Sequence, residues 1–376
     1  MAEEQDEKNV LGDLIKGTSE AIETHTLDKL INKVDELKQS GQNLESRSAA
    51  KKAYGMDIGS SRIVSVRQDD PTGADATHQL NAFIAVPETK FLKDMLVKNH
   101  MAHTKIRDEI AVLGYDAQQF ANIFNREIRR PIKKGLITPE EVYAIPILKE
   151  IINLVLPRPK EVAQPLCFSV SAPAMGFESD LVYHEGVLKK YLVGLGYKAK
   201  SIFEGMAVVL AELAHDNFTG VGISMGAGMC NVCFSFLSIP VIVFSLSKGG
   251  DDIDASVARM TNETINRVRV IKEESLDFTR TPKSNLENGL IIYYEDLIMT
   301  LLNTLSAKLS QAERLPGINQ AVPIVLAGGT CLPNGFKARF EQLLHEVKMP
   351  IAISSVRLAR DPLKTTAMGA LVSATV

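Results

Sequence analysis

Three glycine turns, each closing an apolar segment, constrain the fold of this chain more than any other feature. The first lies in Asp57-Ile58-Gly59-Ser60-Ser61, the second in Gly226-Ala227-Gly228, and the third in Gly328-Gly329. Glycine lets the backbone approach a ligand closely and direct its N–H groups at an anion. Each turn follows residues of strand-forming type, so the pattern predicts three strand ends that can cradle phosphate groups.

The rest of the chain from Lys52 onward alternates between strand and helix patterns. Strands are predicted at 54–67, 79–86, 167–172 and 324–327. Helices are predicted at 138–156, 176–195, 202–213, 295–312 and 335–345. A further helix is expected to start at Asp251, after the Gly249-Gly250 turn. Alternation of this kind indicates an α/β fold.

Composition excludes several classes of protein. A chain of 376 residues is long enough for two domains with cores of their own. The net charge of −3 gives no reason to expect nucleic acid as a partner. No apolar run approaches the roughly 18 to 20 residues of a membrane span, and the N-terminus lacks the basic and apolar regions of a signal peptide. We therefore expect no integral membrane segment and a cytoplasmic location.

Four cysteines are present, two of them in a C-x-x-C pair formed by Cys230 and Cys233; the others are Cys167 and Cys331. Such a pair can signal zinc or redox chemistry. Both residues lie in a run with strand character, where residues three apart point to opposite faces. Core cysteines are the favoured interpretation, with a metal or redox site as the alternative.

Residues 1–50 form an acidic segment that differs from the rest of the chain. Five apolar residues fall on one face of a predicted helix: Leu27, Leu30, Ile31, Val34 and Leu37. Thr26 is suited to cap this helix and Gly41 to end it. Three interpretations are open: the helix docks on its own domain, binds a protein partner, or lies on a membrane surface. The last is disfavoured because the polar face is not basic and carries no aromatic anchor.

Taken together, the turns resemble the paired phosphate loops and the adenosine loop of the actin and heat-shock-chaperone ATPase superfamily, in the same order. Five further segments resemble motifs of that superfamily: 130–137 (R-P-x-x-x-G-x-I), 171–174 (V-P-A), 203–207 (E-P-x-A-A), 249–254 (G-G-x-x-F-D) and 361–370 (D-P-x-x-x-x-A-x-G-A). The resemblance covers about residues 54–376 and is greatest for the bacterial MreB and MamK branch.

The resemblance implies an actin-like ATPase fold. Such a fold has two pseudo-symmetric domains, each a mixed sheet flanked by helices, with a nucleotide cleft between them. The acidic extension would occupy 1–50. Domain I would occupy 51–198, with an outer subdomain at about 87–134, and domain II would occupy 199–376, with an outer subdomain at about 255–322.

The resemblance also implies that ATP binds in the cleft with Mg²⁺, which Asp57 would hold, largely through water. The implied nucleotide-binding residues are Asp57, Gly59, Ser60, Ser61, Ser224, Gly226, Gly228, Gly249, Gly250, Lys272, Glu273, Gly328 and Gly329. Lys272 and Glu273 are included because they stand where the family contacts adenosine. Each glycine turn taken alone is also explained by an ordinary β-turn, and the sequence does not distinguish ATP from GTP.

Glu204 is the implied catalytic residue. It resembles the residue that orients the attacking water in MreB-type proteins, as a general base or water positioner. The alternative is a glutamate favoured at a helix N-terminus by the helix dipole.

The second hairpin departs from the family pattern D-x-G-x-G-T. Ser224 stands in place of the aspartate, Met229 in place of the threonine, and Asn231 in place of a later acidic residue. Loss of a preorganised polar group at such a site typically slows the reaction by about 10²- to 10³-fold. We expect nucleotide binding with slow or no hydrolysis. Asp251, Asp252 and Asp254 could replace the missing charge, or they form a solvated helix N-terminus, which is the favoured interpretation.

Three functions follow from the resemblance. The leading one is a cytoskeletal protein that self-associates head to tail into filaments, since a heterologous contact builds open strands. The second is an enzyme or chaperone of the same fold, although no substrate-binding domain follows the ATPase body and no sugar-kinase site is evident. The third is a pseudo-ATPase adaptor that recruits partners through residues 1–50.

Overall fold

The computed structural model describes residues 52–67, 76–124, 127–173, 178–312 and 320–376. The predicted helix at 26–41 lies outside the described residues. Contacts within the chain separate a unit at 1–50 from a unit at 51–376. The account below concerns the second unit.

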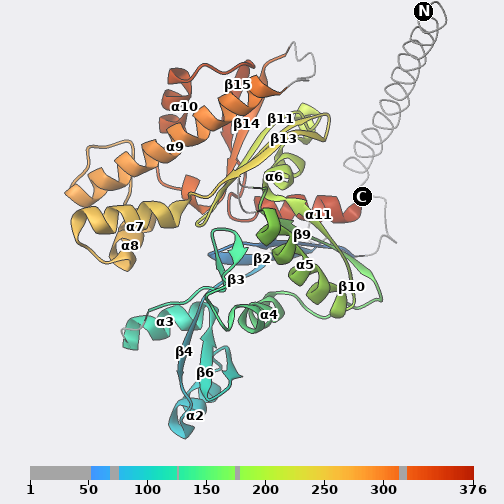
Figure 1. The fold of residues 1–376 in the computed structure, drawn as a ribbon, viewed down its shortest axis with the longest axis vertical. Helices are drawn as coiled ribbons and strands as arrows, with labels where there is room; N and C mark the ends of the chain where they lie inside the picture. Colours follow the sequence, from blue (N-terminus) through green and yellow to red (C-terminus); the bar gives the residue numbers. More distant parts are fainter. Residues whose placement is uncertain (1–51, 68–75, 125–126, 174–177, 313–319) are drawn as a thin grey trace, which may run out of the picture. The chain divides into compact units, whose positions relative to one another are not determined.

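A first mixed sheet has the strand order β10-β9-β1-β2-β3 (Figure 1). Its strands are β1 (Tyr54–Ile58), β2 (Arg62–Arg67), β3 (Thr77–Leu80), β9 (Gln164–Val170) and β10 (Tyr197–Phe203). The chain runs antiparallel through β1, β2 and β3, and parallel from β1 to β9 and β10. This sheet confirms the strands expected at 54–67 and 167–172.

A second mixed sheet repeats this order as β15-β14-β11-β12-β13. Its strands are β11 (Gly220–Met225), β12 (Cys230–Phe236), β13 (Ile239–Leu246), β14 (Val322–Ala327) and β15 (Ile353–Leu358). Here too an antiparallel meander is followed by two parallel strands. The repeated topology confirms the predicted pair of pseudo-symmetric sheets.

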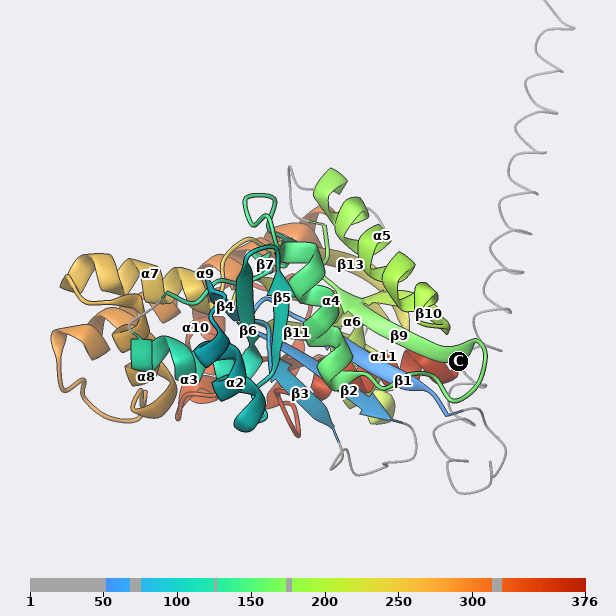
Figure 2. The ribbon, with the colours of Figure 1, turned by 90° about the horizontal axis from the view of Figure 1, so that it is seen from below.

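Helices cover both faces of each sheet. On the first sheet, α4 (Ala144–Val155) and α5 (Glu178–Gly194) pack on one face and α11 (Thr365–Thr375) on the other (Figure 2). On the second sheet, α6 (Glu204–Glu212) packs on one face. Its other face carries a large core built with α7 (Gly250–Thr261), α8 (Ile265–Glu274), α9 (Asn285–Gln311) and α10 (Phe336–Glu346).

A smaller sheet, order β4-β6-β5, is inserted after β3. Its strands are β4 (Phe83–Pro87), β5 (His103–Ile106) and β6 (Glu109–Leu113), with helices α2 (Lys90–Lys98) and α3 (Gly114–Phe124) beside it. A short hairpin of β7 (Ile132–Lys133) and β8 (Leu136–Ile137) follows. Two single-turn 3₁₀ helices, η1 (Ala214–Asp216) and η2 (Gly329–Cys331), complete the described elements.

Several sequence predictions differ from the structure. The helix predicted to begin at 138 begins at Ala144, and β10 (Tyr197–Phe203) was not predicted as a strand. The single strand predicted at 79–86 is instead the end of β3 and the start of β4, which belong to different sheets. The break lies at Asn81, whose Nδ2 donates to the Gly59 carbonyl at 2.9 Å. The helix predicted to begin at 295 begins at Asn285, because Ser284 accepts a hydrogen bond from the amide of Glu287 and caps it ten residues earlier than the apolar pattern indicates.

The four cysteines are free and buried, as expected for core residues. Cys230 belongs to the core that β12 shares with α7 and α9. The Cys233 Sγ instead lies 3.8 Å from the Met206 Sδ of α6, on the other face of the sheet. Among the described residues, no cluster of three or more histidine, cysteine or acidic side chains could hold a metal ion.

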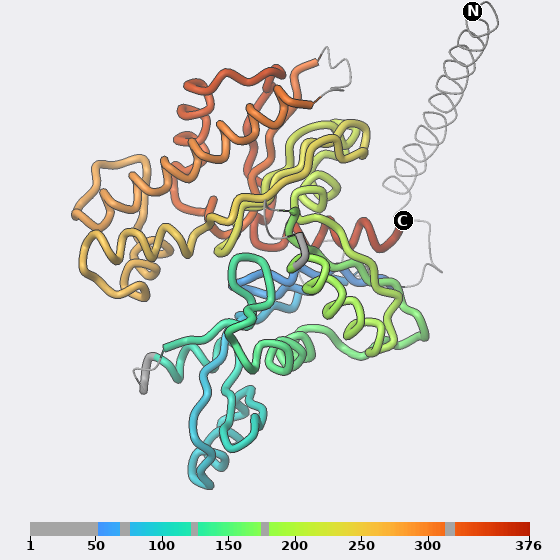
Figure 3. The backbone as a smooth tube through the Cα atoms, viewed as in Figure 1, coloured from blue at the N-terminus to red at the C-terminus, as the bar shows by residue number. Residues whose placement is uncertain are grey.

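Helices α11 and α6 pack against each other between the two sheets (Figure 3), and glycines allow this close packing. An added Cβ at Gly55 of β1 would lie 2.2 Å from the Ala367 carbonyl of α11, and one at Gly369 would lie 1.8 Å from the Ala207 carbonyl of α6. A Cβ at Gly205 of α6 would lie 2.6 Å from the Cys233 amide of β12. The succession β1, α11, α6 and β12 is therefore packed backbone against backbone.

Within the described part of the chain, no helix has the length and apolar character needed to cross a lipid bilayer.

Replacing Gly369 by alanine should destabilise the protein, because the carbonyl it would meet belongs to a helix backbone that cannot move independently. We expect the free energy of unfolding to fall by about 3 kcal/mol, measured by urea denaturation. The matched control is Gly186→Ala on the exposed face of α5, where no atom lies within 4 Å of the added Cβ. That change should raise stability by about 0.5–1 kcal/mol. Equal effects of the two substitutions would contradict the close packing.

Candidate functional site

A cleft with a volume of about 490 Å³ lies where the glycine turns meet. It is lined from the first sheet by Asp57, Gly59, Ser60 and Ser61, and from the second by Ser224 and residues 226–229. The third turn contributes Gly328, Gly329 and Thr330, and α8 contributes Lys272 and Glu273. Of the predicted nucleotide-binding residues, the structure thus brings together all except Gly249 and Gly250 around one cavity.

The first two turns have the same geometry. The Gly59 amide donates to the Arg62 carbonyl at 3.0 Å, and the Gly226 amide donates to the Met229 carbonyl at 2.9 Å. The turns approach each other closely, because a Cβ on Gly228 would lie 2.6 Å from the Ser60 Oγ. In the part of the chain that the structure describes, the amides at 60, 61, 227 and 228 make no hydrogen bond. Such amides are suited to bind an anion.

The third turn is attached to the second. Thr330 Oγ1 donates to the Gly226 carbonyl at 2.9 Å, and the Gly328 amide donates to the Pro362 carbonyl at 2.8 Å. Gly328 has φ +95°, and a Cβ there would lie 2.3 Å from the Met225 carbonyl. Only glycine fits this position without strain.

Gly249 and Gly250 support the second turn from behind rather than lining the cleft. The Gly250 amide donates to the Gly226 carbonyl at 3.1 Å, and the Asp251 amide donates to the Ala227 carbonyl at 2.8 Å. A Cβ on Gly249 would lie 2.5 Å from the Ala227 carbonyl. The start of α7 therefore fixes the shape of the hairpin.

Two of the carboxyl groups that line the cleft, those of Asp57 and Glu204, lie close together. Ser169 Oγ donates to Asp57 Oδ1 at 2.7 Å, and removal from bulk water raises the pKa of Asp57 to about 6. Glu204 is the first residue of α6, and Ser224 Oγ donates to its Oε2 at 2.8 Å. Burial, and then the nearby Asp57 carboxylate, raise the pKa of Glu204 to about 8, against the lowering effect of its hydrogen bonds. The pair favours binding of a proton or a cation.

Asn231 completes this group of polar side chains. Its Oδ1 accepts a hydrogen bond from the Ala172 amide at 2.7 Å, which leaves Nδ2 buried and without a partner among the described residues. The amide also lies near the Glu204 carboxyl group and helps to lower its pKa. A neutral amide thus stands where the family pattern has an acid.

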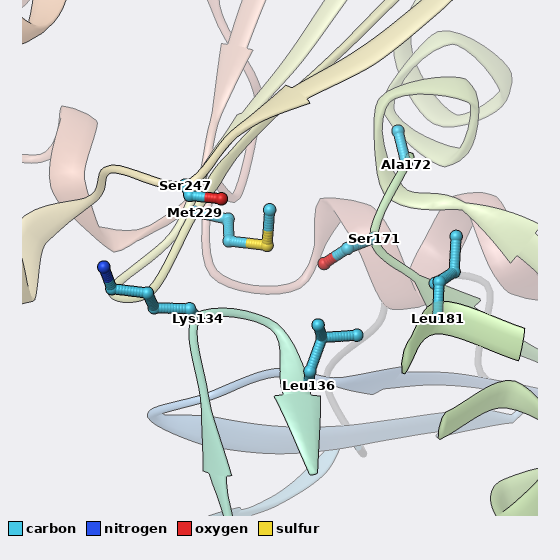
Figure 4. Close-up of a pocket in the computed structure, with 7 residues that line it drawn as sticks. All are labelled: Lys134, Leu136, Ser171, Ala172, Leu181, Met229 and Ser247. Atoms are coloured by element: carbon cyan, nitrogen blue, oxygen red, sulfur yellow. The ribbon is translucent and has the colours of Figure 1, made fainter. Parts of the chain in front are cut away.

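Met229 occupies a small pocket beside the cleft (Figure 4). Figure 4 shows its thioether between Ser171 and Ser247, with Leu136 nearby. A Cβ on Gly135, which has φ +70°, would lie 2.5 Å from the Met229 Sδ. Met229 therefore packs the second turn against the β7–β8 hairpin and supplies no hydroxyl group.

The start of α7 is solvated only in part: the side chains of Asp251 and Asp252 are 35% and 36% exposed, whereas the solvated interpretation was wrong for Asp254. Asp254 is fully buried, and its Oδ2 lies 2.9 Å from the Lys272 Nζ. Asp251 Oδ2 lies 2.6 Å from an Arg130 Nη across the cleft. The periodicity of a helix start does not reveal these partners, because they come from distant parts of the sequence.

The repeated sheets and the facing glycine turns define an actin-like fold. This fold resembles that of a MamK double helical filament, with a TM-score of 0.65 and 17% identity over 86% of this chain and 99% of that one. It also resembles MreB 5 of Spiroplasma citri bound to AMPPNP, with a TM-score of 0.58 and 12% identity over 85% and 94% of the two chains. A non-polymerising MamK mutant bound to AMPPNP gives 0.55 and 17% over 87% and 99%.

Residues 52–374 match the family described as Volactin, and the chain belongs to this family. No curated protein matches the sequence.

The raised pKa values make stability depend on pH. A folded-state pKa above the unfolded value stabilises the protein at low pH, and this contribution is lost as pH rises through the folded pKa. Without nucleotide and Mg²⁺, the free energy of unfolding should therefore fall as pH rises from about 5 to about 8. Glu204→Gln should remove part of this fall, by about 1–2 kcal/mol since both groups face solvent in the cleft.

Urea denaturation of both proteins at several pH values between 5 and 8 measures this difference. Glu161→Gln, at an exposed position before β9, is the matched control. An unchanged pH profile in Glu204→Gln would show that the carboxyl pair is not coupled to folding.

Proposed function

We propose that this protein is a nucleotide-binding cytoskeletal protein that polymerises into filaments and hydrolyses ATP slowly or not at all. The observation that carries the proposal is the pair of glycine turns, facing each other across a cleft of about 490 Å³ with unpaired amides at their tips. A cleft of this volume is typical of sites for small molecules and cofactors. The fold likeness to a MamK filament supports assembly, and the AMPPNP in two similar structures supports a nucleoside triphosphate as ligand.

The residues of the cleft fit ATP with Mg²⁺. The turns around Gly59 and Gly226 would hold the phosphates from opposite sides, and the Gly328-Gly329 turn with Glu273 would border the nucleoside. Asp57 would hold Mg²⁺, because its carboxylate faces the cleft beside a second carboxyl group. Mg²⁺ would supply positive charge that neutralises the phosphates and stabilises both carboxylates.

Slow hydrolysis follows from the same residues. Compared with the family pattern, Ser224 carries a hydroxyl group in place of a carboxylate, Met229 has no hydroxyl group, and Asn231 is neutral. Glu204 is then the candidate for positioning the attacking water. With a pKa of about 8, it holds a proton at neutral pH and is a poor base until a cation lowers that pKa.

We propose two domains at 51–198 and 199–376, with outer subdomains at about 87–134 and about 255–322; the boundary falls inside β10, which belongs to the first sheet. The small β4-β6-β5 sheet, residues 83–113, supports the first outer subdomain. Residues 1–50 are proposed as a segment that binds a protein partner, and the protein as cytoplasmic.

High-speed pelleting of the purified full chain, with and without ATP and Mg²⁺, tests the proposal. We expect filaments in negative-stain images of the pellet only when nucleotide is present, because ligand held by both turns would draw the two halves together. Filaments that form equally without nucleotide would show that assembly is uncoupled from the cleft. A protein that stays soluble in both conditions would favour the non-polymerising adaptor instead.

Restoring the acidic side chain should speed hydrolysis. Ser224→Asp, alone or with Met229→Thr, is expected to raise the rate of phosphate release from ATP by about 10²- to 10³-fold when Mg²⁺ is present. Without Mg²⁺ the variant should be less stable than the parent, because a third carboxylate joins Asp57 and Glu204. Ser310→Asp, at an exposed position of α9, controls for the added charge. An unchanged rate would place the limit on hydrolysis elsewhere.

A further inference from the structure

Four basic side chains line the cleft, and three of them are neutralised by carboxylates. Lys272 Nζ lies 2.9 Å from Asp254 Oδ2 and also donates to the Gly250 carbonyl at 3.0 Å. Arg130 and Arg269 share Asp251, at 2.6 Å and 3.5 Å. The charges of these three side chains are therefore largely neutralised by carboxylates of the protein itself.

Arg62 is the fourth, and it differs from the others. Its guanidinium makes no hydrogen bond or ion pair with any residue that the structure describes, although the side chain is half-buried in the cleft wall. Leu80 pairs with Arg62 across β2 and β3, and the cleft is lined here by the apolar Val64, Leu80 and Ala82 and by the polar Ser61, Tyr115 and Gln118. A charge held without a partner in such surroundings is unfavourable unless a ligand supplies the opposite charge.

Strand geometry places Arg62 beside the first phosphate turn. It is the first residue of β2, and residues two apart in a strand share a face, so Arg62 and Val64 point the same way. Val64 is paired with Asp57 across the β1–β2 hairpin, which puts Asp57 on that face as well. The guanidinium thus lies on the same wall as the proposed Mg²⁺ ligand, next to the turn at Gly59.

The positive charge is felt by a neighbouring residue. His78 pairs with Val64 across β2 and β3, and its Nδ1 lies 2.9 Å from the Tyr115 Oη. Burial lowers the pKa of His78, and the charges of Arg62 and Lys364 lower it further. Lys364 is itself paired with Asp361 at 3.0 Å. Arg62 and Lys364 therefore make the surroundings of His78, at the β2–β3 edge, positive.

We propose that Arg62 binds the phosphate chain of the nucleotide and makes the cleft selective for nucleoside di- and triphosphates over nucleosides. This inference rests on the proposed nucleotide binding and deepens it. Arg62 supplies a fork of N–H donors that matches phosphate oxygens, in a site where Met229 does not provide the hydroxyl group of the family pattern.

Titration calorimetry of the full chain with ATP–Mg²⁺, ADP–Mg²⁺ and adenosine tests this role. Arg62→Gln should weaken binding of ATP and ADP by about 10- to 100-fold and leave the affinity for adenosine unchanged. Arg62→Lys, which keeps the charge and loses the fork, should lie between the parent and Arg62→Gln. Arg267→Gln is the matched control, because its side chain is 64% exposed on α8 and outside the cleft.

The outcomes separate this inference from the proposed function. If the parent protein binds none of the three ligands, the proposed function fails, and the inference fails with it. If the parent binds ATP and Arg62→Gln binds it equally well, only the inference is overturned. An equal loss for ATP and adenosine would also overturn it, since Arg62 would then support the structure of the cleft and not the phosphates.

Discussion

The close packing of α11 against α6 is the constraint on which the rest of the structure depends. Three glycines, Gly55, Gly369 and Gly205, let β1, α11, α6 and β12 meet without side chains between them. The functional groups are placed by these same elements: Glu204 opens α6, and the segment before α11 accepts the hydrogen bond that holds Gly328. The distance between the two sheets, and hence the depth of the cleft, is fixed where no side-chain rearrangement can adjust it.

The charges of the cleft are balanced unevenly along its length. At the start of α7 every carboxylate has a cationic partner, and the Arg130–Asp251 pair bridges the two walls. At the phosphate turns the carboxyl groups of Asp57 and Glu204 lie close together; burial raises the pKa of both, and the Asp57 carboxylate raises that of Glu204 further. The charged groups are thus paired with each other at the α7 end of the cleft, but the two carboxyl groups at the phosphate turns are not paired with a cation among the described residues. A ligand with both a metal ion and phosphates matches the end at the phosphate turns.

The sequence indicates the parts of the site that are local in the chain. Glycine turns after apolar strands, and Glu204 at a helix start, can be recognised because the relevant signals lie within a few residues. The partners of the charged groups cannot be found in this way, since Arg130 and Asp251 meet only through the tertiary fold. The same limit explains Asp254, whose helix-start position suggests exposure while the fold buries it against Lys272. Gly249 and Gly250 belong to a recognisable motif, yet only the structure separates residues that line the cleft from residues that support its lining.

The equal geometry of the two hairpins allows them to be compared position by position. The hydrogen bonds that close the turns make Gly59 equivalent to Gly226 and Arg62 equivalent to Met229. Strand pairing likewise makes Asp57 equivalent to Ser224. At each charged position of the first hairpin the second carries a neutral residue. The first hairpin is therefore ionic and the second neutral. Within the turns, a phosphate would thus meet charged side chains only from the first hairpin, and backbone amides from both.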